Sequence, residues 1–282
     1  MSIADIISSL PSLKLTIEAY GLMAQKSLGQ NFLLDSNITD KIVRSSLRAQ
    51  NLPSFADACL FEVGSGPTGL TRSILKAEPQ KLTVIELDER CIKIAEDIRA
   101  RVGDRLEIVN QDALTYDFTA PAAAPKHILS NLPYNISVPL LSKWLADIGC
   151  YKSLTLMFQK EVAERLMAST KTKDYGRLSV LTQLQCRITH LFDLPPEAFT
   201  PAPKIWSSVL LLQPVIAPLS REEIAHLEKI TALAFSKRRK MLRQTFKHIA
   251  DFADICEQIG IVPTSRPEEL TPQQFFELSQ SL

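Results

Sequence analysis

The chain has 282 residues, of which 45% are hydrophobic and 22% charged, and these values are ordinary for a globular protein with one large and one small domain. Its net charge is +1, and it shows neither an apolar run of membrane-spanning length nor the basic-then-apolar order of a signal peptide. These features argue against a membrane protein and a secreted one, so we expect a cytoplasmic protein, and we expect a monomer. The cysteines and histidines are scattered without a Cys-x-x-Cys pair, so we predict neither disulfides nor a metal site.

Strand patterns alternate with helical patterns through the first two thirds of the chain. A helix is predicted over residues 36–49, with Asp35 or Ser36 as its cap. Strands are predicted over residues 59–63, 82–86, 106–109, 127–130 and 153–158, and helices between them over residues 70–77, 89–101 and 138–147. Strand and helix in alternation form parallel units with right-handed crossovers. The expected fold class is therefore α/β, with a doubly wound, Rossmann-like sheet.

The pattern changes near Pro214, after a proline-rich stretch. Ser220 and Glu223 form the pattern of a capping box that opens a helix over residues 222–235. Further helices are predicted over residues 240–250, 252–259 and 273–279. We therefore expect two domains, an α/β domain over residues 1–214 and a small, all-helical domain over residues 215–282.

A cluster of basic residues lies in the predicted helical domain. Between residues 229 and 250 the chain has seven basic side chains and no acidic one: Lys229, Lys237, Arg238, Arg239, Lys240, Arg243 and Lys247. Such a cluster attracts phosphate even where acids elsewhere cancel the net charge. A solvated helix face explains the pattern equally well. The candidate contacts to a nucleic acid are Arg238, Arg239, Lys240 and Arg243.

Glycines follow the first predicted strand. Gly64, Gly66 and Gly69 match the spacing G-x-G-x-x-G, which lets the backbone turn tightly and approach a nucleotide closely. Glu86 ends the next strand, where a carboxylate can accept hydrogen bonds from the ribose hydroxyls of an adenosine cofactor. This spacing alone is compatible with NAD as well as with S-adenosylmethionine.

Two further carboxylates favour S-adenosylmethionine. Glu62 lies directly before the glycines, where it can meet the cationic methionine end of that cofactor and would repel the pyrophosphate of NAD. Asp112 follows the third strand and can accept a hydrogen bond from the adenine amino group, although a simple turn residue is the alternative. Because Glu62, Glu86 and Asp112 stand at three successive strand ends, we predict S-adenosylmethionine as the cofactor.

The fourth predicted strand runs directly into Asn131-Leu132-Pro133-Tyr134. The carboxyl ends of strands in an open α/β sheet face the ligand crevice. The exocyclic nitrogen of adenine is a poor nucleophile, and the Asn131 side-chain oxygen and the Leu132 carbonyl can hold its two hydrogens. Pro133 fixes the backbone, and Tyr134 offers a ring for stacking the base. An Asn-x-Pro turn with a half-buried tyrosine is the alternative, but beside the carboxylates the tetrapeptide favours methyl transfer to an adenine amino group.

The chain resembles the ribosomal RNA adenine dimethylase family, and within it the group that acts on small-subunit rRNA. The matching segments are residues 27–33 (SLGQNFL), 62–71, 84–88, 111–113, 131–135 (NLPYN), 158–165 and 199–207 (FTPAPKIWS). They follow one another in order between about residues 26 and 210. One departure is mild, since many members carry proline at the Ser65 position and a small residue at the Thr68 position.

The resemblance implies further site residues, a substrate and a partner. The implied cofactor contacts are Asn31, Leu33, Gly64, Glu86, Asp112 and Asn131. Phe199 is implied to close on the target base opposite Tyr134, although a core residue before a proline turn is the alternative for Phe199. The implied reaction converts two adjacent adenosines in the 3′-terminal hairpin loop of 16S rRNA to N6,N6-dimethyladenosine. The implied partner is the immature small ribosomal subunit.

Three other functions are compatible with parts of the sequence. An enzyme of the same chemistry could modify a different adenine, in large-subunit rRNA or in DNA, because the tetrapeptide reads the base and not its surroundings. An RNA-binding assembly or transcription factor without turnover is disfavoured by the intact Glu86, Asp112 and tetrapeptide. An NAD oxidoreductase rests only on the glycine spacing.

Overall fold

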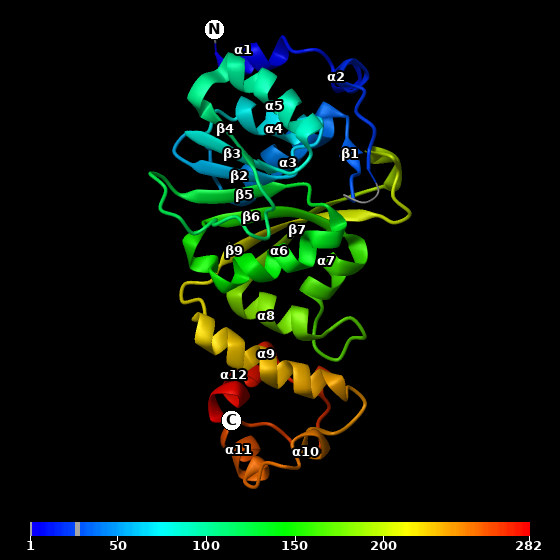
Figure 1. The fold of residues 1–282 in the computed structure, drawn as a ribbon. Coiled ribbons are helices and arrows are strands. Elements are labelled where there is room, and N and C mark those ends of the chain that lie inside the picture. The colour runs from blue at the N-terminus through cyan, green and yellow to red at the C-terminus, as the bar shows by residue number, and fades with distance from the viewer. Residues whose placement is uncertain (1, 26–28) are drawn as a thin grey trace. The chain divides into compact units, whose positions relative to one another are not determined.

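The computed structural model describes residues 2–25 and 29–282 (Figure 1). Ser27 and Leu28, which belong to the first segment of the resemblance, lie outside the described residues. Within the described ranges, one sheet has the strand order β4 (Leu106–Asn110), β3 (Lys81–Glu86), β2 (Cys59–Val63), β5 (Lys126–Ser130), β6 (Ser153–Gln159), β9 (Ser207–Pro214) and β7 (Cys186–Leu194). A separate antiparallel pair joins β1 (Phe32–Leu33) to β8 (Phe199–Thr200).

The strand pairing of the larger sheet determines where a ligand site forms. β2 pairs in parallel with β3 and β5, β3 pairs with β4, and β5 pairs with β6. The strand order therefore reverses between β2 and β5. In an open α/β sheet the crevice at such a switch point, beyond the carboxyl ends of the strands, holds the ligand. The α/β, Rossmann-like fold predicted from the sequence is confirmed.

The predicted strands form because their apolar residues are buried on both faces of the sheet. Every residue of β2 and of β5 is buried, which is typical of parallel strands covered by helices. All five predicted strands are present within one residue of their expected bounds. The sequence did not predict β7 and β9; β9 pairs antiparallel with β6, with Leu210 opposite Leu156.

Six helices accompany this sheet in the described part of the chain up to Ala146: α1 (Ile3–Ser8), α2 (Leu13–Tyr20), α3 (Ser36–Ala49), α4 (Gly69–Lys76), α5 (Glu89–Val102) and α6 (Tyr134–Ala146). α3 has its predicted bounds, and its cap is the Asp35 side chain, which accepts a hydrogen bond from the Asn37 N–H at 2.8 Å. α3 packs against α4, where Ser73 Oγ donates to Asp40 Oδ1 at 2.6 Å.

The chain forms two compact units. The first comprises Met1–Trp144, Cys150–Lys160 and Thr189–Gln213, and the second comprises Leu145–Gly149, Glu161–Ile188 and Pro214–Leu282. The second unit contains α7 (Lys160–Met167, from Glu161), α8 (Arg177–Gln185), α9 (Arg221–Ser236), α10 (Leu242–Thr245), α11 (Phe252–Gln258) and α12 (Pro272–Ser281). The sequence placed one division after residue 214, whereas the second unit also takes in residues 161–188. Inside this unit Tyr175 Oη donates to the Leu270 carbonyl at 2.9 Å and its ring meets Phe235 edge-on.

One predicted helix of the second unit is wrong. A helix was expected over residues 240–250, but α10 is a single turn, Leu242–Thr245. The chain turns after this helix because Phe246 is fully buried and stacks on Phe252, with ring centroids 5.0 Å apart. The helix opened by the Ser220 and Glu223 capping box is confirmed as α9.

No helix of the described residues is long and apolar enough to cross a membrane. Over residues 2–25 and 29–282, no group of three or more His, Cys, Asp or Glu side chains is arranged to hold a metal ion. The cysteines are free, and only Cys150 is exposed among them.

Candidate functional site

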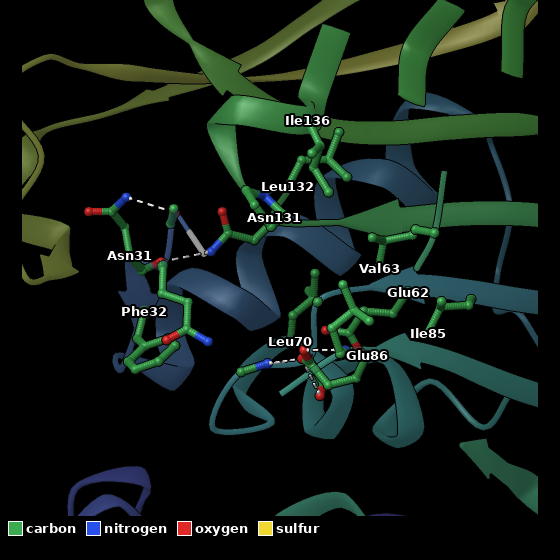
Figure 2. A pocket seen from close by; sticks show the side chains of 18 of the residues that line it. Asn31, Phe32, Glu62, Val63, Leu70, Ile85, Glu86, Asn131, Leu132 and Ile136 are labelled. Atoms are coloured by element: carbon green, nitrogen blue, oxygen red, sulfur yellow. Dashed lines mark hydrogen bonds between the residues drawn. The ribbon is translucent and has the colours of Figure 1, made fainter. Parts of the chain in front are cut away.

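The first unit contains a pocket beyond the carboxyl ends of β2, β3 and β5, and residues 29–33 form part of its wall (Figure 2). Its position is that of the switch point in the strand order. Every residue predicted to contact the cofactor lines this pocket, and so does the tetrapeptide: Asn31, Leu33, Gly64, Glu86, Asp112, Asn131, Leu132, Pro133 and Tyr134. Segments far apart in the sequence therefore meet in one cavity.

The glycine loop brings the backbone of β2 close to the amino-terminal segment. Gly66 has φ +50°, and a Cβ atom on it would lie 3.0 Å from Cδ1 of Phe32. Gly69 opens α4, and a Cβ atom there would lie 2.7 Å from the Leu33 carbonyl oxygen. The glycines of the G-x-G-x-x-G spacing therefore have two effects. They allow the tight turn of the loop, and their lack of a side chain leaves space for residues 32 and 33 in the pocket wall.

Glu86 is the most tightly held carboxylate of the site. Its Oε1 accepts hydrogen bonds from the N–H groups of Leu87 at 2.8 Å and Asp88 at 3.0 Å. Its Oε2 accepts from Ser65 Oγ and from the Gly66 N–H, both at 3.2 Å. Burial raises the pKa of Glu86 and these donors oppose that shift. The carboxylate is therefore fixed in orientation, with Oε2 bonded to the glycine loop.

Glu62 is buried more deeply, with 1% of its surface exposed. Its Oε2 accepts a hydrogen bond from Thr71 Oγ1 at 2.6 Å. Burial, with a smaller contribution from the nearby charge of Glu86, raises the pKa of Glu62 to about 8, although the hydrogen bond from Thr71 acts in the opposite direction. Because desolvation favours the neutral form, Glu62 ionises most readily when a cation faces it.

Asp112 and Asn131 border the pocket from β4 and β5. Asp112 Oδ1 accepts a hydrogen bond from the Leu114 N–H at 2.8 Å, which orients the carboxylate. Asn131 Nδ2 donates to the Asn31 carbonyl at 3.2 Å, and Figure 2 shows the Asn131 side-chain oxygen directed away from Asn31. The side-chain amide is therefore fixed with its nitrogen toward the amino-terminal segment and its acceptor oxygen free of that contact.

Tyr134 begins α6 and is anchored by β9. Its Oη lies 2.6 Å from Ser207 Oγ. Burial raises the pKa of the Tyr134 hydroxyl above its ordinary value, so the phenol keeps its proton. Pro133 packs near Gly64, where a Cβ atom would be 3.5 Å from the proline Cδ. The tetrapeptide is thus held at both ends, by Asn31 and by Ser207.

Phe199 has a different environment from the one that the resemblance implied. It is 3% exposed, pairs with Leu33 between β8 and β1, and belongs to a core cluster with Ile42 and Val43. It is not among the residues that line the pocket. Its contact with a target base stays a prediction, and it would require the ring to leave this cluster.

The four candidate RNA contacts lie in the second unit. Arg239, Lys240 and Arg243 are exposed. Arg238 is partly engaged, because its Nη2 donates to the Thr172 carbonyl at 2.9 Å and its Nε lies 3.9 Å from Glu268 Oε2. Arg238 therefore has a structural contact in addition to any contact with RNA.

Two residues of the site were not singled out from the sequence. Gln30 lines the pocket, and its Nε2 donates to Asp88 Oδ2 at 2.9 Å. A hydrogen bond from Arg90 lowers the pKa of Asp88 to about 2, so this carboxylate is ionised. Ser207 is the partner of Tyr134. No spacing rule marks either residue, since each contact joins segments that are distant in the sequence.

Comparison with known proteins identifies the family. The Ribosomal RNA adenine dimethylase family matches residues 21–282. A protein of Rhodospirillum rubrum named ribosomal RNA small subunit methyltransferase A is 42% identical over 273 residues, which cover 97% of this chain and 93% of that protein.

Solved structures agree on the fold. A dimethyladenosine transferase from Plasmodium falciparum superposes with a TM-score of 0.71 at 26% identity, covering 86% of this chain and 94% of that one. The 23S rRNA methyltransferase ErmE has a TM-score of 0.64 at 22% identity, covering 89% of this chain and 99% of that one, and shows the fold alone. The chain belongs to the ribosomal RNA adenine dimethylase family, whose members are methyltransferases that use S-adenosylmethionine.

Proposed function

We propose that this chain transfers methyl groups from S-adenosylmethionine to N6 of two adjacent adenosines in the 3′-terminal hairpin loop of small-subunit rRNA, giving N6,N6-dimethyladenosine. The observation that carries the proposal is the extent of the match: nearly the whole chain aligns with a relative named for the small ribosomal subunit. The pocket supports the chemistry, because the tetrapeptide borders the same cavity as the acidic residues predicted to hold the cofactor.

The residues of the pocket fit S-adenosylmethionine. Glu86 would accept hydrogen bonds from the ribose hydroxyls, and Asp112 would accept one from the adenine amino group. Glu62 would face the ammonium of the methionine end, where its raised pKa makes ionisation depend on that positive charge. When bound, the cofactor supplies an electrophilic methyl group on a sulfonium. The chain's own contribution is to orient the two reactants and to exclude water.

Asn131 and Leu132 would position the target amino group. The Asn131 side-chain oxygen and the Leu132 carbonyl accept its two hydrogens, so the lone pair of N6 points at the methyl carbon. The bound cofactor would supply the methyl group: a new N–C bond would form as the S–C bond breaks, and the electron pair of the broken bond would stay on the sulfur of S-adenosylhomocysteine. The methylated nitrogen then loses a proton to water, so no general base in the pocket is required. Tyr134, held by Ser207, would stack on the base.

The substrate would be the immature small subunit, bound by the chain as a monomer in the cytoplasm. A hairpin loop suits the reaction, because its unpaired bases can be turned out at little cost. The exposed Arg239, Lys240 and Arg243 would contact the RNA backbone through phosphate.

The test is methylation of immature small subunits from cells that lack the activity, with S-adenosylmethionine labelled in its methyl group. The label should appear in the 3′-terminal fragment of the rRNA. Asn131→Ala should lose turnover by about a hundredfold or more while its affinity for subunits changes far less, because the variant removes an acceptor for the target amino group. Label in large-subunit rRNA or DNA instead of the 3′-terminal fragment would refute the proposed substrate, and equal loss of binding and turnover in Asn131→Ala would refute the role of Asn131.

A further inference from the structure

The hydroxyl of Ser65 contacts the carboxylate predicted to bind the cofactor ribose. Ser65 lies in the glycine loop with 5% of its surface exposed, and its Oγ donates to Glu86 Oε2 at 3.2 Å. Glu86 is also largely buried, at 8% exposure. The contact therefore joins two largely buried side chains in the pocket wall.

The acceptor sites of Glu86 are filled by the chain itself. A carboxylate offers about four lone-pair sites, and four donors reach this one, two on each oxygen. The bonds to Oε1, from the N–H groups of Leu87 and Asp88, are the shorter ones at 2.8 and 3.0 Å and come from backbone that follows Glu86 directly. Those to Oε2 are longer, at 3.2 Å. Of the four donors only Ser65 Oγ can turn away by rotation of a side chain.

We propose that Ser65 limits the affinity of this chain for S-adenosylmethionine, because its hydroxyl competes with a ribose hydroxyl for Oε2 of Glu86. A ribose hydroxyl can donate to Oε2 only if the hydrogen bond from Ser65 breaks. The net binding free energy from that ribose contact is therefore small. The same competition weakens binding of S-adenosylhomocysteine, which has the same ribose. The inference rests on the cofactor of the family and not on the identity of the RNA substrate.

The experiment compares two ligands on two proteins by isothermal titration calorimetry. The ligands are S-adenosylhomocysteine and its 2′,3′-dideoxy analogue, which lacks the competing hydroxyls. Ser65→Ala should bind S-adenosylhomocysteine on the order of tenfold more tightly than the wild type, because the ribose then meets an acceptor with one donor fewer. Binding of the dideoxy analogue should not change.

A matched control is Ser73→Ala. Ser73 is also a buried serine whose hydroxyl donates to a carboxylate, Asp40, at 2.6 Å, but it lies outside the pocket wall. Ser73→Ala should leave the ratio of the two dissociation constants at its wild-type value. The ratio is measured on one protein preparation, so a partly unfolded variant changes the stoichiometry and not the ratio.

Three outcomes would overturn the proposal. One is an unchanged ratio of the two dissociation constants in Ser65→Ala, whether both ligands shift together or neither does. Another is weaker binding of S-adenosylhomocysteine by Ser65→Ala, which would mean that Ser65 supports the bound ribose. The third is the same change of ratio in Ser73→Ala. None of these outcomes depends on methylation of any RNA, so each is separate from a failure of the proposed substrate.

Discussion

Removal of the Glu62 carboxyl should abolish the pH dependence of cofactor binding. Burial raises the pKa of Glu62 to about 8, so the side chain is mostly protonated at pH 7. A Glu62 that faces the ammonium of S-adenosylmethionine or S-adenosylhomocysteine has to be ionised. Binding therefore expels a proton, and the complex holds fewer protons than the free chain, so affinity increases as the pH rises toward 8.

The magnitude follows from this pKa. One pH unit below it, about nine tenths of the side chains are protonated, so binding at pH 7 should release about 0.9 proton. The dissociation constant of S-adenosylhomocysteine should rise about tenfold when the pH is lowered from 7 to 6, which corresponds to about 1.36 kcal/mol. Glu62→Gln has no titrating group at this position, so its dissociation constant should be the same at both pH values.

The assay is titration calorimetry at pH 6 and pH 7, in two buffers of different ionisation enthalpy, which counts the protons released. Work at or below pH 7 keeps the amino group of the ligand charged, since its pKa is about 8. Glu107→Gln is the matched control, because Glu107 is on β4, pairs with Lys81 at 3.0 Å and does not line the pocket. This variant should keep the pH dependence. A wild-type dissociation constant that stays constant from pH 6 to 7, with no proton released, would refute the proposed contact of Glu62 with the cofactor.

Three other perturbations test the site and the basic cluster. Without cofactor, the free energy of unfolding should fall between pH 6 and pH 8 by about 2 kcal/mol more in the wild type than in Glu62→Gln. The reason is that Glu62 keeps its proton in the folded chain over this range, whereas in the unfolded chain it has lost the proton near its ordinary pKa of 4.5. Chemical denaturation that gives parallel curves for the two proteins would contradict this. Gly66→Ala should weaken cofactor binding, whereas Gly103→Ala should only lower the free energy of unfolding by about 1–2 kcal/mol. Both glycines have a positive φ, but only at Gly66 would the new Cβ atom meet an aromatic ring, that of Phe32, at 3.0 Å. Equal effects of the two variants on cofactor affinity would exclude a role for the packing of Gly66 against Phe32. Arg239→Glu and Arg238→Glu should both weaken RNA binding in a salt-dependent way. Only Arg238→Glu should also lower the melting temperature, because Arg238 donates a hydrogen bond within the second unit. If Arg239→Glu binds RNA as tightly as the wild type, the basic cluster is a solvated surface and not an RNA contact.

The sequence predicted the strands, and it predicted which polar residues meet at one pocket, because both depend on local patterns. A strand buried on both faces is a run of apolar residues, as in β2 and β5. Residues at the carboxyl ends of parallel strands lie at the same edge of the sheet, however the connecting helices pack. Glu86, Asp112 and Asn131 could therefore be placed together before any contact was known.

The features that the sequence missed depend on contacts between distant segments. For Phe199 the sequence left a base contact and a core position open; the side chain packs in the core because β8 pairs with β1, and nothing in residues 199–207 shows which partner that short strand takes. β7 is only partly buried along its length, so its pattern is weak, and its place beside β9 is decided by pairing. The short α10 follows from the stacking of Phe246 on Phe252, which ends a pattern that otherwise reads as a longer helix. In each case tertiary packing overrides the local preference.

The central claim is that this chain dimethylates two adjacent adenosines near the 3′ end of small-subunit rRNA. The most direct test is mass spectrometry of the 3′-terminal rRNA fragment from cells whose only enzyme of this kind is the wild-type chain or Asn131→Ala. We expect N6,N6-dimethyladenosine at both adjacent positions with the wild-type chain and unmodified adenosine at both with the variant. Unmodified adenosines in the wild-type fragment, together with methylated adenine in another RNA or in DNA, would contradict it.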